Sequence, residues 1–323
     1  MLRRSTFWFY SCLHMVFTYS SETPIIGILT QETYIVAKYL PENRYNSFLA
    51  ASYVKFLEGS GARVVPVWIG QNKEYYERVV NYTNGILFPG GGTYFNETDG
   101  YGEAARQIYK LALESNARGV YYPILGICLG MQVLVFSHIG TDIRIHRSLK
   151  HTAVPLDFTE GYEKSKLFSN TPKHILHILK SKNVTHNLHR YSITEEILNK
   201  HRLLDQWRIL STNRGDDENE FISSMEHKNF PIYGIQFHPE KNIFEFKKNY
   251  GIPHSADAVK SAQFFANFFV DECRKNNNGF PSEELEENSL IYNYIPLYTG
   301  LNGSSHVQLY VFSKDDYTKC LLV

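Results

Sequence analysis

Short apolar runs alternate with longer amphipathic segments along the first part of this chain, and this alternation limits the fold more than any other feature. Runs that are rich in Ile, Val and Leu and bounded by Gly or Pro predict buried strands at 24–31, 62–69, 85–92 and 121–130. Apolar residues at helical spacing predict helices at 46–61, 73–82 and 101–116. This order predicts an α/β fold in which a mostly parallel sheet is covered by helices on both faces.

The pattern becomes less regular after residue 150. The stretch "FISSMEHKNFPIYGIQFHPEK" predicts two strands around a turn at 229–231, and residues 254–276 form a strongly apolar helical pattern. The tail contains "LIYNYIPLYTG" and "VQLYVF", which predict a linker and an extended segment laid back on the body. The sequence has no internal repeat, no metal-ligand cluster and no dinucleotide or Walker fingerprint.

Charge excludes some classes of partner. Lys and Arg number 33, as do Asp and Glu, so the formal charge is zero, and there is no long basic block. Nothing electrostatic therefore favours nucleic acid or an anionic membrane. Small-molecule or peptide chemistry remains. Because 323 residues can bury a large core, we expect one globular domain.

The first 21 residues have the composition of a secretory signal peptide. Arg3 and Arg4 precede an apolar-aromatic run that ends in small polar residues. A poorly packed strand or a short membrane anchor is the alternative, but the run is too short to span a bilayer and His14 interrupts it.

Acceptor patterns for N-glycosylation agree with a secreted protein. The pattern N-x-[ST] occurs at Asn81, Asn96, Asn183 and Asn302, whereas a proline excludes Asn170. Cleavage of the signal peptide would remove Cys12 and leave Cys128, Cys273 and Cys320, too few for a disulfide framework. A pair between Cys273 and Cys320 would leave Cys128 as a free thiol, which calls for an explanation.

The motif "GICLG" places Cys128 between two glycines, where a predicted strand ends and a helical pattern begins. So sharp a turn brings the neighbouring backbone segments close together, and Gly126 and Gly130 would relieve that crowding because they have no side chain. The turn also puts Cys128 at a helix N-terminus, where N–H groups and the dipole favour the reactive thiolate. A small buried structural cysteine is the alternative, but the whole pattern favours a nucleophile.

The motif "YGIQFHPEK" offers the base that a nucleophilic cysteine needs. Thirteen histidines are present, and His238 stands apart because it ends an apolar run and is followed by Pro239, which stops the strand, and then by Glu240. A carboxylate at this spacing can orient the imidazole and stabilise its charged form. His238 and Glu240 are therefore predicted to complete a catalytic triad with Cys128.

Glycine-rich backbone in "FPGGGTYF" completes the set of catalytic elements. At the end of a strand it can turn N–H groups toward an acyl oxygen. We expect an oxyanion hole from one of Gly90, Gly91 and Gly92, together with the N–H of Leu129. A tight turn that requires positive φ is the simpler explanation of the glycines, and both can hold.

The order P-G-G, G-x-C-x-G and H-P-E resembles the catalytic series of the class I glutamine amidotransferase-like superfamily. Within it, the chain is similar to the gamma-glutamyl hydrolase family over about residues 24–312, through "PIIGILTQE", "AASYVKFLEGSGARVVPV", "NLHRYS" and the C-terminal tail. The resemblance implies a three-layer α/β/α sandwich around a mostly parallel sheet. It divides the chain into a signal peptide at 1–21, a catalytic domain at 22–312 and a tail at 313–323.

Carried over residue by residue, the resemblance makes Cys128 the nucleophile and His238 its general acid and base. Glu240 takes the third triad position, with less importance in hydrolases than in amidotransferases. His189 in "NLHRYS" falls where the hydrolases have a histidine near the site, in contact with substrate.

The activity that the resemblance implies is cleavage of gamma-glutamyl bonds in folate or antifolate polyglutamates through a thioester, with release of glutamate or short glutamate chains. It implies a secreted, lysosomal or vacuole-like location and requires no metal, cofactor, nucleic acid or stable membrane association. The resemblance does not decide whether the protein forms a homodimer. Because the substrate carries carboxylates, we expect cationic residues near the site, with Arg44, Lys150 and Arg190 as candidates.

One position departs from the hydrolase pattern. After the nucleophile the chain reads "LGMQ", the amidotransferase form, where "LGFE" is expected in many gamma-glutamyl hydrolases. Gln132 would then occupy the position that helps to hold free glutamine. A glutaminase that supplies ammonia to a synthetase is therefore the alternative function, and a binding protein without activity is a third.

Overall fold

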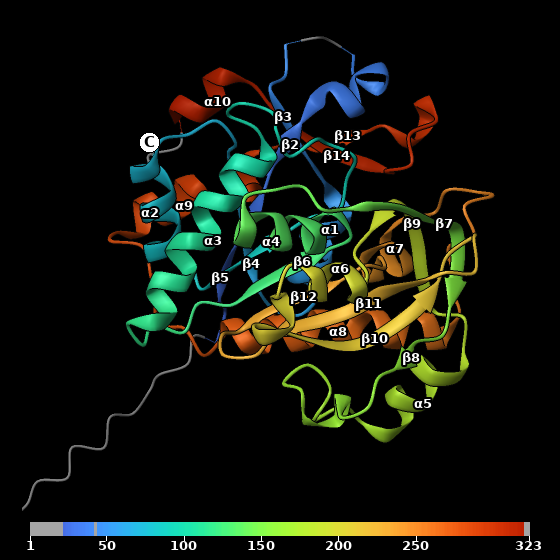
Figure 1. Cartoon of the computed structure of the whole chain (residues 1–323). Coiled ribbons are helices and arrows are strands. Elements are labelled where there is room, and N and C mark those ends of the chain that lie inside the picture. Colours follow the sequence, from blue (N-terminus) through green and yellow to red (C-terminus); the bar gives the residue numbers. More distant parts are fainter. Residues whose placement is uncertain (1–21, 42–43, 320–323) are drawn as a thin grey trace, which may run out of the picture.

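The computed structural model describes residues 22–41 and 44–319, so the predicted signal peptide with Cys12, and Cys320, lie outside the described residues. An eight-stranded sheet forms the centre of the molecule (Figure 1). Its order is β4 (Arg63–Val67), β1 (Ile25–Leu29), β5 (Gly85–Phe88), β6 (Ile124–Ile127), β12 (Ile232–Ile235), β11 (Glu220–His227), β10 (Trp207–Arg214) and β8 (Asp157–Phe158). The first five strands pair in parallel and the last three join by antiparallel pairing. The predicted α/β fold with a mostly parallel sheet is confirmed.

Helices cover both faces of this sheet (Figure 1). One layer contains α2 (Lys73–Tyr82), α3 (Tyr101–Ala117) and α4 (Leu129–Ile139), and the other contains α1 (Ala51–Glu58), α7 (Pro239–Phe244) and α8 (Ala256–Cys273). Crossovers between parallel strands are right-handed. The crossover from β1 to β4 and the crossover from β4 to β5 run in opposite directions across the sheet, so their helices α1 and α2 cover opposite faces. Strand residues of β1, β5 and β6 are buried on both sides, as the continuous apolar runs predicted.

Four residues of the helix predicted at 46–61 form a strand instead. They make up β3 (Ser47–Ala50), and the helix α1 begins only at Ala51. The strand belongs to a second sheet with the order β13 (Leu297–Tyr298), β14 (Gln308–Phe312), β3 and β2 (Gln31–Glu32). The prediction was wrong here because the run "SFLAA" suits either structure locally, whereas the partner that selects the strand, β14, lies at the other end of the chain.

The C-terminal tail packs on the body as an integral layer. Its strand β14 pairs with β3, and the ring of Phe312 contacts Trp68 at 4.4 Å between centroids. The following helix α10 (Lys314–Lys319) stacks Tyr317 on Trp68 at 5.1 Å. The predicted extended segment laid back on the body is thus confirmed for 308–312.

The remaining elements lie around this framework. Strands β7 (Ile145–Val154) and β9 (Thr185–Ser192) form a separate antiparallel ribbon, and the short helices are α5 (Lys173–Ser181), α6 (Glu195–Lys200) and α9 (Glu283–Ser289). The two strands predicted around 229–231 are β11 and β12, and the predicted C-terminal helix is α8. None of the helices in the described part of the chain has the length and apolar character needed to cross a membrane.

Candidate active site

The three predicted catalytic motifs meet at one edge of the central sheet. Strands β5, β6 and β12 are neighbours and parallel, so their carboxyl ends lie side by side. Gly90 follows β5, Cys128 follows β6 directly, and His238 comes three residues after β12. The carboxyl edge of an open parallel sheet is where such folds collect their reactive groups.

Cys128 occupies a strained turn between β6 and α4. Its φ of 54° and ψ of −106° are unusual for a residue with a side chain, and its N–H donates to the carbonyl of Ile235 at 2.7 Å. The glycines on either side are needed for close backbone contact. A Cβ on Gly130 would lie 1.8 Å from the carbonyl oxygen of Phe88, and one on Gly126 would lie 2.4 Å from that of Gly130. The crowding expected at this turn is therefore present.

His238 and Glu240 form a buried pair beside the sulfur. The imidazole Nδ1 lies 2.8 Å from Glu240 Oε1, and the two side chains are 5% and 0% exposed. Burial alone would lower the pKa of His238, but the Glu240 carboxylate and the Cys128 sulfur outweigh it and raise the pKa to about 9. With its Nδ1–H donated to Glu240, the imidazole can exchange a proton with the sulfur through Nε2.

Tyr53 on α1 links the histidine to the glycine-rich loop, and no motif in the sequence marks it. Its hydroxyl oxygen accepts the N–H of Gly90 at 2.8 Å and lies 3.4 Å from His238 Nδ1. A Cβ on Gly90 would lie 2.6 Å from His238 Cε1 and 2.7 Å from the Tyr53 hydroxyl oxygen. Gly90 is therefore a position of close approach, and its N–H is already used.

The other oxyanion-hole candidates remain available as donors. Within the described residues, the N–H groups of Gly91, Gly92 and Leu129 donate to no protein acceptor. Gly91 packs against Gln31, whose amide donates to the carbonyl oxygens of Pro89 and Gly90 at 3.3 Å each. Gln31, the first residue of β2, thus holds the loop together with Tyr53.

Two histidines of β9, His186 and His189, lie close enough to His238 for its charge to change their pKa values. Burial and that charge lower the pKa of His189 to about 4, and burial and the same charge lower the pKa of His186 to about 3. His189 Nδ1 donates to the carbonyl of Arg147 at 3.1 Å, which leaves its buried Nε2 as an acceptor with no partner in the described protein. His189 is thus near the site, as expected, whereas the sequence did not single out His186.

Gln132 is buried one turn after the nucleophile and is hydrogen-bonded at both ends of its amide. Nε2 donates to the carbonyl of Tyr191 at 2.6 Å and to Gln236 Oε1 at 3.1 Å, while Oε1 accepts from Arg144 at 3.4 Å. Gln236 in turn places Nε2 at 3.4 Å from the Cys128 sulfur. The sequence did not single out Gln236 or Arg144, because these contacts join segments far apart in the chain.

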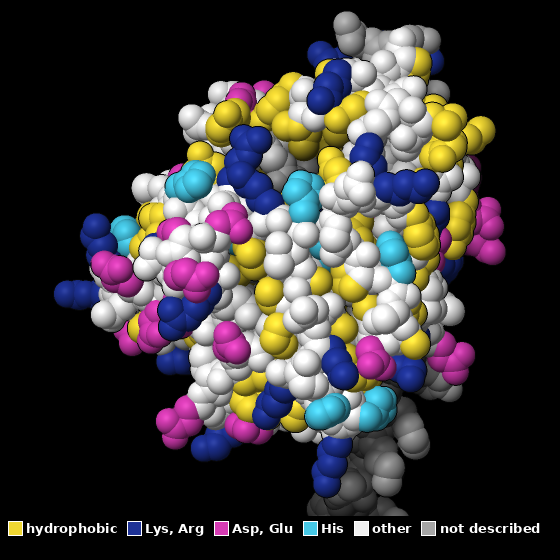
Figure 2. Space-filling model, turned by 90° about the vertical axis from the view of Figure 1, so that its right-hand side faces the viewer, with side chains coloured by type: hydrophobic (Ala, Val, Ile, Leu, Met, Phe, Trp, Pro, Cys, Tyr) yellow, Lys and Arg dark blue, Asp and Glu magenta, His cyan; other side chains and the backbone are white. Residues whose placement is uncertain are grey.

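Two of the three predicted cationic residues lie on the β7–β9 ribbon. Lys150 and Arg190 are exposed there, and the exposed Arg44 precedes β3 with its guanidinium 5.4 Å from the ring centre of Tyr45. Figure 2 shows the side of the molecule that carries this ribbon, where Lys, Arg and His side chains are spread over both the upper and the lower half of the face. All four predicted glycosylation positions, Asn81, Asn96, Asn183 and Asn302, are exposed.

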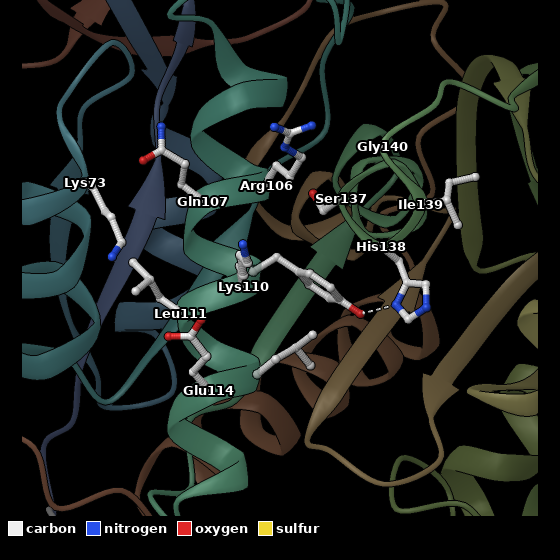
Figure 3. A pocket seen from close by; sticks show the side chains of 12 residues that line it. Lys73, Arg106, Gln107, Lys110, Leu111, Glu114, Ser137, His138, Ile139 and Gly140 are labelled. Carbon is white, nitrogen blue, oxygen red and sulfur yellow. Dashed lines mark hydrogen bonds between the residues drawn. The ribbon is translucent and has the colours of Figure 1, made fainter.

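A surface pocket of about 580 Å³, drawn in Figure 3, has none of Cys128, His238 and Glu240 in its lining. It is lined by α3 and the C-terminal end of α4, including Arg106, Lys110 and His138. Cys128 precedes the opposite end of α4, about 15 Å away along the helix. This pocket is therefore not part of the candidate active site.

The other thiol of the described chain has no such surroundings. Cys273 is free and fully buried in α8, and burial raises its pKa well above the usual value. No group of three or more His, Cys, Asp or Glu side chains in the described ranges is arranged to hold a metal ion. The features of an activated thiol therefore belong to Cys128.

Comparison with known proteins gives one family. The Peptidase C26 family matches residues 24–240. A gamma-glutamyl hydrolase of Rattus norvegicus is 40% identical over 293 residues, which cover 91% of this chain and 90% of the relative. A gamma-glutamyl hydrolase of Homo sapiens is 40% identical, with 91% of each chain covered, and gamma-glutamyl hydrolase B of Dictyostelium discoideum is 37% identical, with 91% and 84% covered.

Proposed function

Because this chain belongs to the peptidase C26 family, we propose that it is a gamma-glutamyl hydrolase with Cys128 as its nucleophile. The observation that carries the proposal is the meeting of Cys128 with the buried His238–Glu240 pair at the carboxyl edge of the sheet. Relatives that align with nine-tenths of the chain bear the name of this hydrolase.

In the first half of the reaction, the Cys128 thiolate attacks the carbonyl carbon of a gamma-glutamyl amide. A C–S bond forms, and the N–H groups of Leu129 and of Gly91 or Gly92 stabilise the oxyanion. When the C–N bond breaks, the His238 imidazolium gives its Nε2 proton to the leaving amine. A raised pKa for His238 suits this step, because the imidazole then carries the proton that the leaving amine needs.

In the second half, water enters after the amine has left. The now neutral His238 accepts a proton from water, hydroxide attacks the thioester carbonyl, and the C–S bond breaks to restore the thiolate. Glu240 holds the imidazole in place and stabilises its charge in both halves. His189 Nε2 is a buried acceptor near this point and is suited to an N–H group of the substrate.

We propose folate or antifolate polyglutamates as the substrates. Each gamma-linked glutamate carries a free α-carboxylate, so the substrate is a polyanion attached to an aromatic group. Lys150 and Arg190 on the β7–β9 ribbon favour such a ligand electrostatically.

The glutaminase alternative is not favoured. It drew its support from Gln132, whose amide is hydrogen-bonded to protein groups at both ends. The relatives named above are gamma-glutamyl hydrolases.

We also propose that the protein enters the secretory pathway and acts outside the cell or in a lysosome-like or vacuole-like compartment. The composition of residues 1–21 supports this, as does the exposure of Asn81, Asn96, Asn183 and Asn302. Treatment of the protein from its native host with peptide N-glycosidase would lower its mass if these sites carry glycans, and an unchanged mass would count against this location.

The hydrolase itself is tested with a defined folate pentaglutamate and mass spectrometry of the products. Wild type should release glutamate or short glutamate chains, whereas Cys128→Ala should release none and Cys273→Ala should retain the wild-type products. Full activity in Cys128→Ala would refute the assigned nucleophile. Ammonia release from free glutamine faster than gamma-peptide cleavage would favour the glutaminase.

A further inference from the structure

We propose that Arg144, Gln132 and Gln236 form a hydrogen-bond relay that ends on the Cys128 sulfur and stabilises the thiolate. The relay consists of three consecutive hydrogen bonds, of 3.4, 3.1 and 3.4 Å. It deepens the proposed function, since it rests on Cys128 being the nucleophile. The three residues are positioning residues, because they act on the reaction through the sulfur.

The first residue of the relay is a held and largely buried cation. Arg144 donates to both carboxylate oxygens of Asp142, at 2.9 and 2.6 Å, and its side chain is only 9% exposed. The guanidinium lies 3.8 Å above the ring centre of Phe95 and 5.5 Å from that of Tyr191. With its plane fixed in this way, the remaining Nη1 group points at Gln132.

The direction of the relay follows from which groups can only donate or only accept. A guanidinium can only donate and a backbone carbonyl can only accept, so Arg144 and Tyr191 O together fix the amide of Gln132. Its Nε2 must then face Gln236 Oε1, and this turns Gln236 Nε2 toward the sulfur. Every hydrogen bond of the relay therefore donates toward Cys128.

A relay with this direction favours the charged form of the thiol. A hydrogen bond donated to a thiolate stabilises it, and donors linked in series polarise one another, most strongly where water is excluded. Gln132, Gln236 and Cys128 are 3%, 0% and 3% exposed. The relay also requires a neutral amide at 132, because a carboxylate there could accept from Arg144 but could not donate to Gln236.

Other groups around the sulfur act on the same equilibrium and must be kept constant in a test. His238, at the N-terminus of α7, interacts with the Cys128 sulfur and is itself paired with Glu240, and Tyr53 of α1 and Tyr101 of α3 lie close enough to interact electrostatically with Cys128. None of these side chains takes part in the hydrogen bonds of the relay. Substitutions within the relay therefore leave the His238–Glu240 pair in place.

The test measures how the rate at which iodoacetamide alkylates Cys128 depends on pH. The rate is monitored by mass spectrometry of the intact protein, for wild type and for each variant. Gln132→Glu and Gln132→Met should each move the acidic midpoint of this profile upward by about one pH unit, since each removes a charge-assisted hydrogen-bond chain. Arg144→Met should move it in the same direction. The methionine variant separates loss of the relay from the charge of a new carboxylate.

Matched controls lie in the pocket of Figure 3, away from the sulfur. Gln107→Glu and Arg106→Met make the same changes of charge there and should leave the midpoint unchanged. A wild-type midpoint in both Gln132 variants overturns the relay, as does a shift of equal size in Gln107→Glu. If Gln132 instead held substrate directly, KM for the polyglutamate would rise while the alkylation profile stayed as in wild type.

Failure of the proposed function gives a different result. Wild-type Cys128 would then be alkylated no faster than the buried Cys273 at any pH, whatever the variants did. Fast labelling of wild-type Cys128 with unchanged profiles in the variants would refute the relay and leave the proposed function standing. Circular dichroism of each variant shows that the fold is retained, and Arg144→Met provides the reading if neither Gln132 variant folds.

Discussion

Replacing Glu240 with Gln would remove the charge that holds the His238 imidazole protonated, without changing the size of the side chain. The carboxylate is 0% exposed, and only its Oε1 has a partner in the described protein, His238 Nδ1 at 2.8 Å. An uncharged amide at this position can accept a hydrogen bond from Nδ1–H, or it can donate one and favour the wrong tautomer. The variant therefore tests both the charge and the orientation of the base.

The size of the effect follows from the pKa of His238. Its rise from 6.5 to about 9 corresponds to roughly 3 kcal/mol of preference for the charged imidazole. Burial opposes this rise, and the charge of Glu240 is the largest single influence that produces it. Loss of Glu240 should remove roughly 1.5 kcal/mol of that preference, which lowers the pKa of His238 by about one unit.

Two measurements check this expectation. The kcat/KM of Glu240→Gln on a gamma-glutamyl substrate at pH 7 should fall by about tenfold or more, because an amide that donates to Nδ1 holds the wrong tautomer. The alkaline limb of its pH profile should also move to lower pH, because the pKa of His238 falls. In urea unfolding, the wild-type pair stabilises the fold because the folded pKa of His238 lies above the unfolded value. That stabilisation is fully present below pH 6.5 and is lost as pH rises through about 9.

The cost of Glu240→Gln in unfolding free energy should therefore be larger at pH 6 than at pH 9.5. As a control, Glu226→Gln removes another buried carboxylate, one that is paired with Arg208 at 3.2 Å and lacks a histidine partner. Its cost should be the same at both pH values. A cost for Glu240→Gln that does not change with pH, or an unchanged kcat/KM, would refute the assignment of Glu240 as the group that charges His238.

Three further predictions follow from the packing. Gly90→Ala should lower kcat/KM by about 100-fold or more, because its Cβ would lie 2.6 Å from a ring carbon of the catalytic histidine, whereas Gly92→Ala, with nothing within 4 Å, should stay near wild type. Tyr53→Phe leaves a buried N–H unpaired and should cost about tenfold in kcat/KM. Phe312→Ala should lower the free energy of unfolding by about 3–5 kcal/mol in a urea titration, because this buried ring packs on Trp68; a loss below about 1 kcal/mol would mean that the tail is dispensable.

The sequence predicted the central sheet because its signals are local. Apolar runs bounded by Gly or Pro mark β1, β4, β5 and β6, and each ends close to a motif that turns the chain. The second sheet could not be predicted in this way, because β3 is a strand only through its partner β14. Pairings between distant segments leave little trace in the pattern of either segment.

The same division holds within the candidate site. Cys128, His238 and Glu240 stand in motifs whose spacing carries their chemistry, so each could be named from the sequence. Tyr53 and Gln31 lie within an ordinary helical or strand pattern, and only the folded chain brings their side chains to the glycine-rich loop. Groups that support a site from a distance have no spacing of their own to reveal them.

Gln132 shows how a structure can change the meaning of a sequence motif. In the motif alone, an amide after the nucleophile suggests that free glutamine is held there. In the folded chain, two donors and one acceptor position of that amide already bind Tyr191 O, Gln236 and Arg144. A substrate that took one of them would break a buried hydrogen bond at a cost of roughly 1–3 kcal/mol, or about a 5- to 150-fold loss of affinity. The amide therefore serves the protein better as a support for the sulfur than as a contact for glutamine.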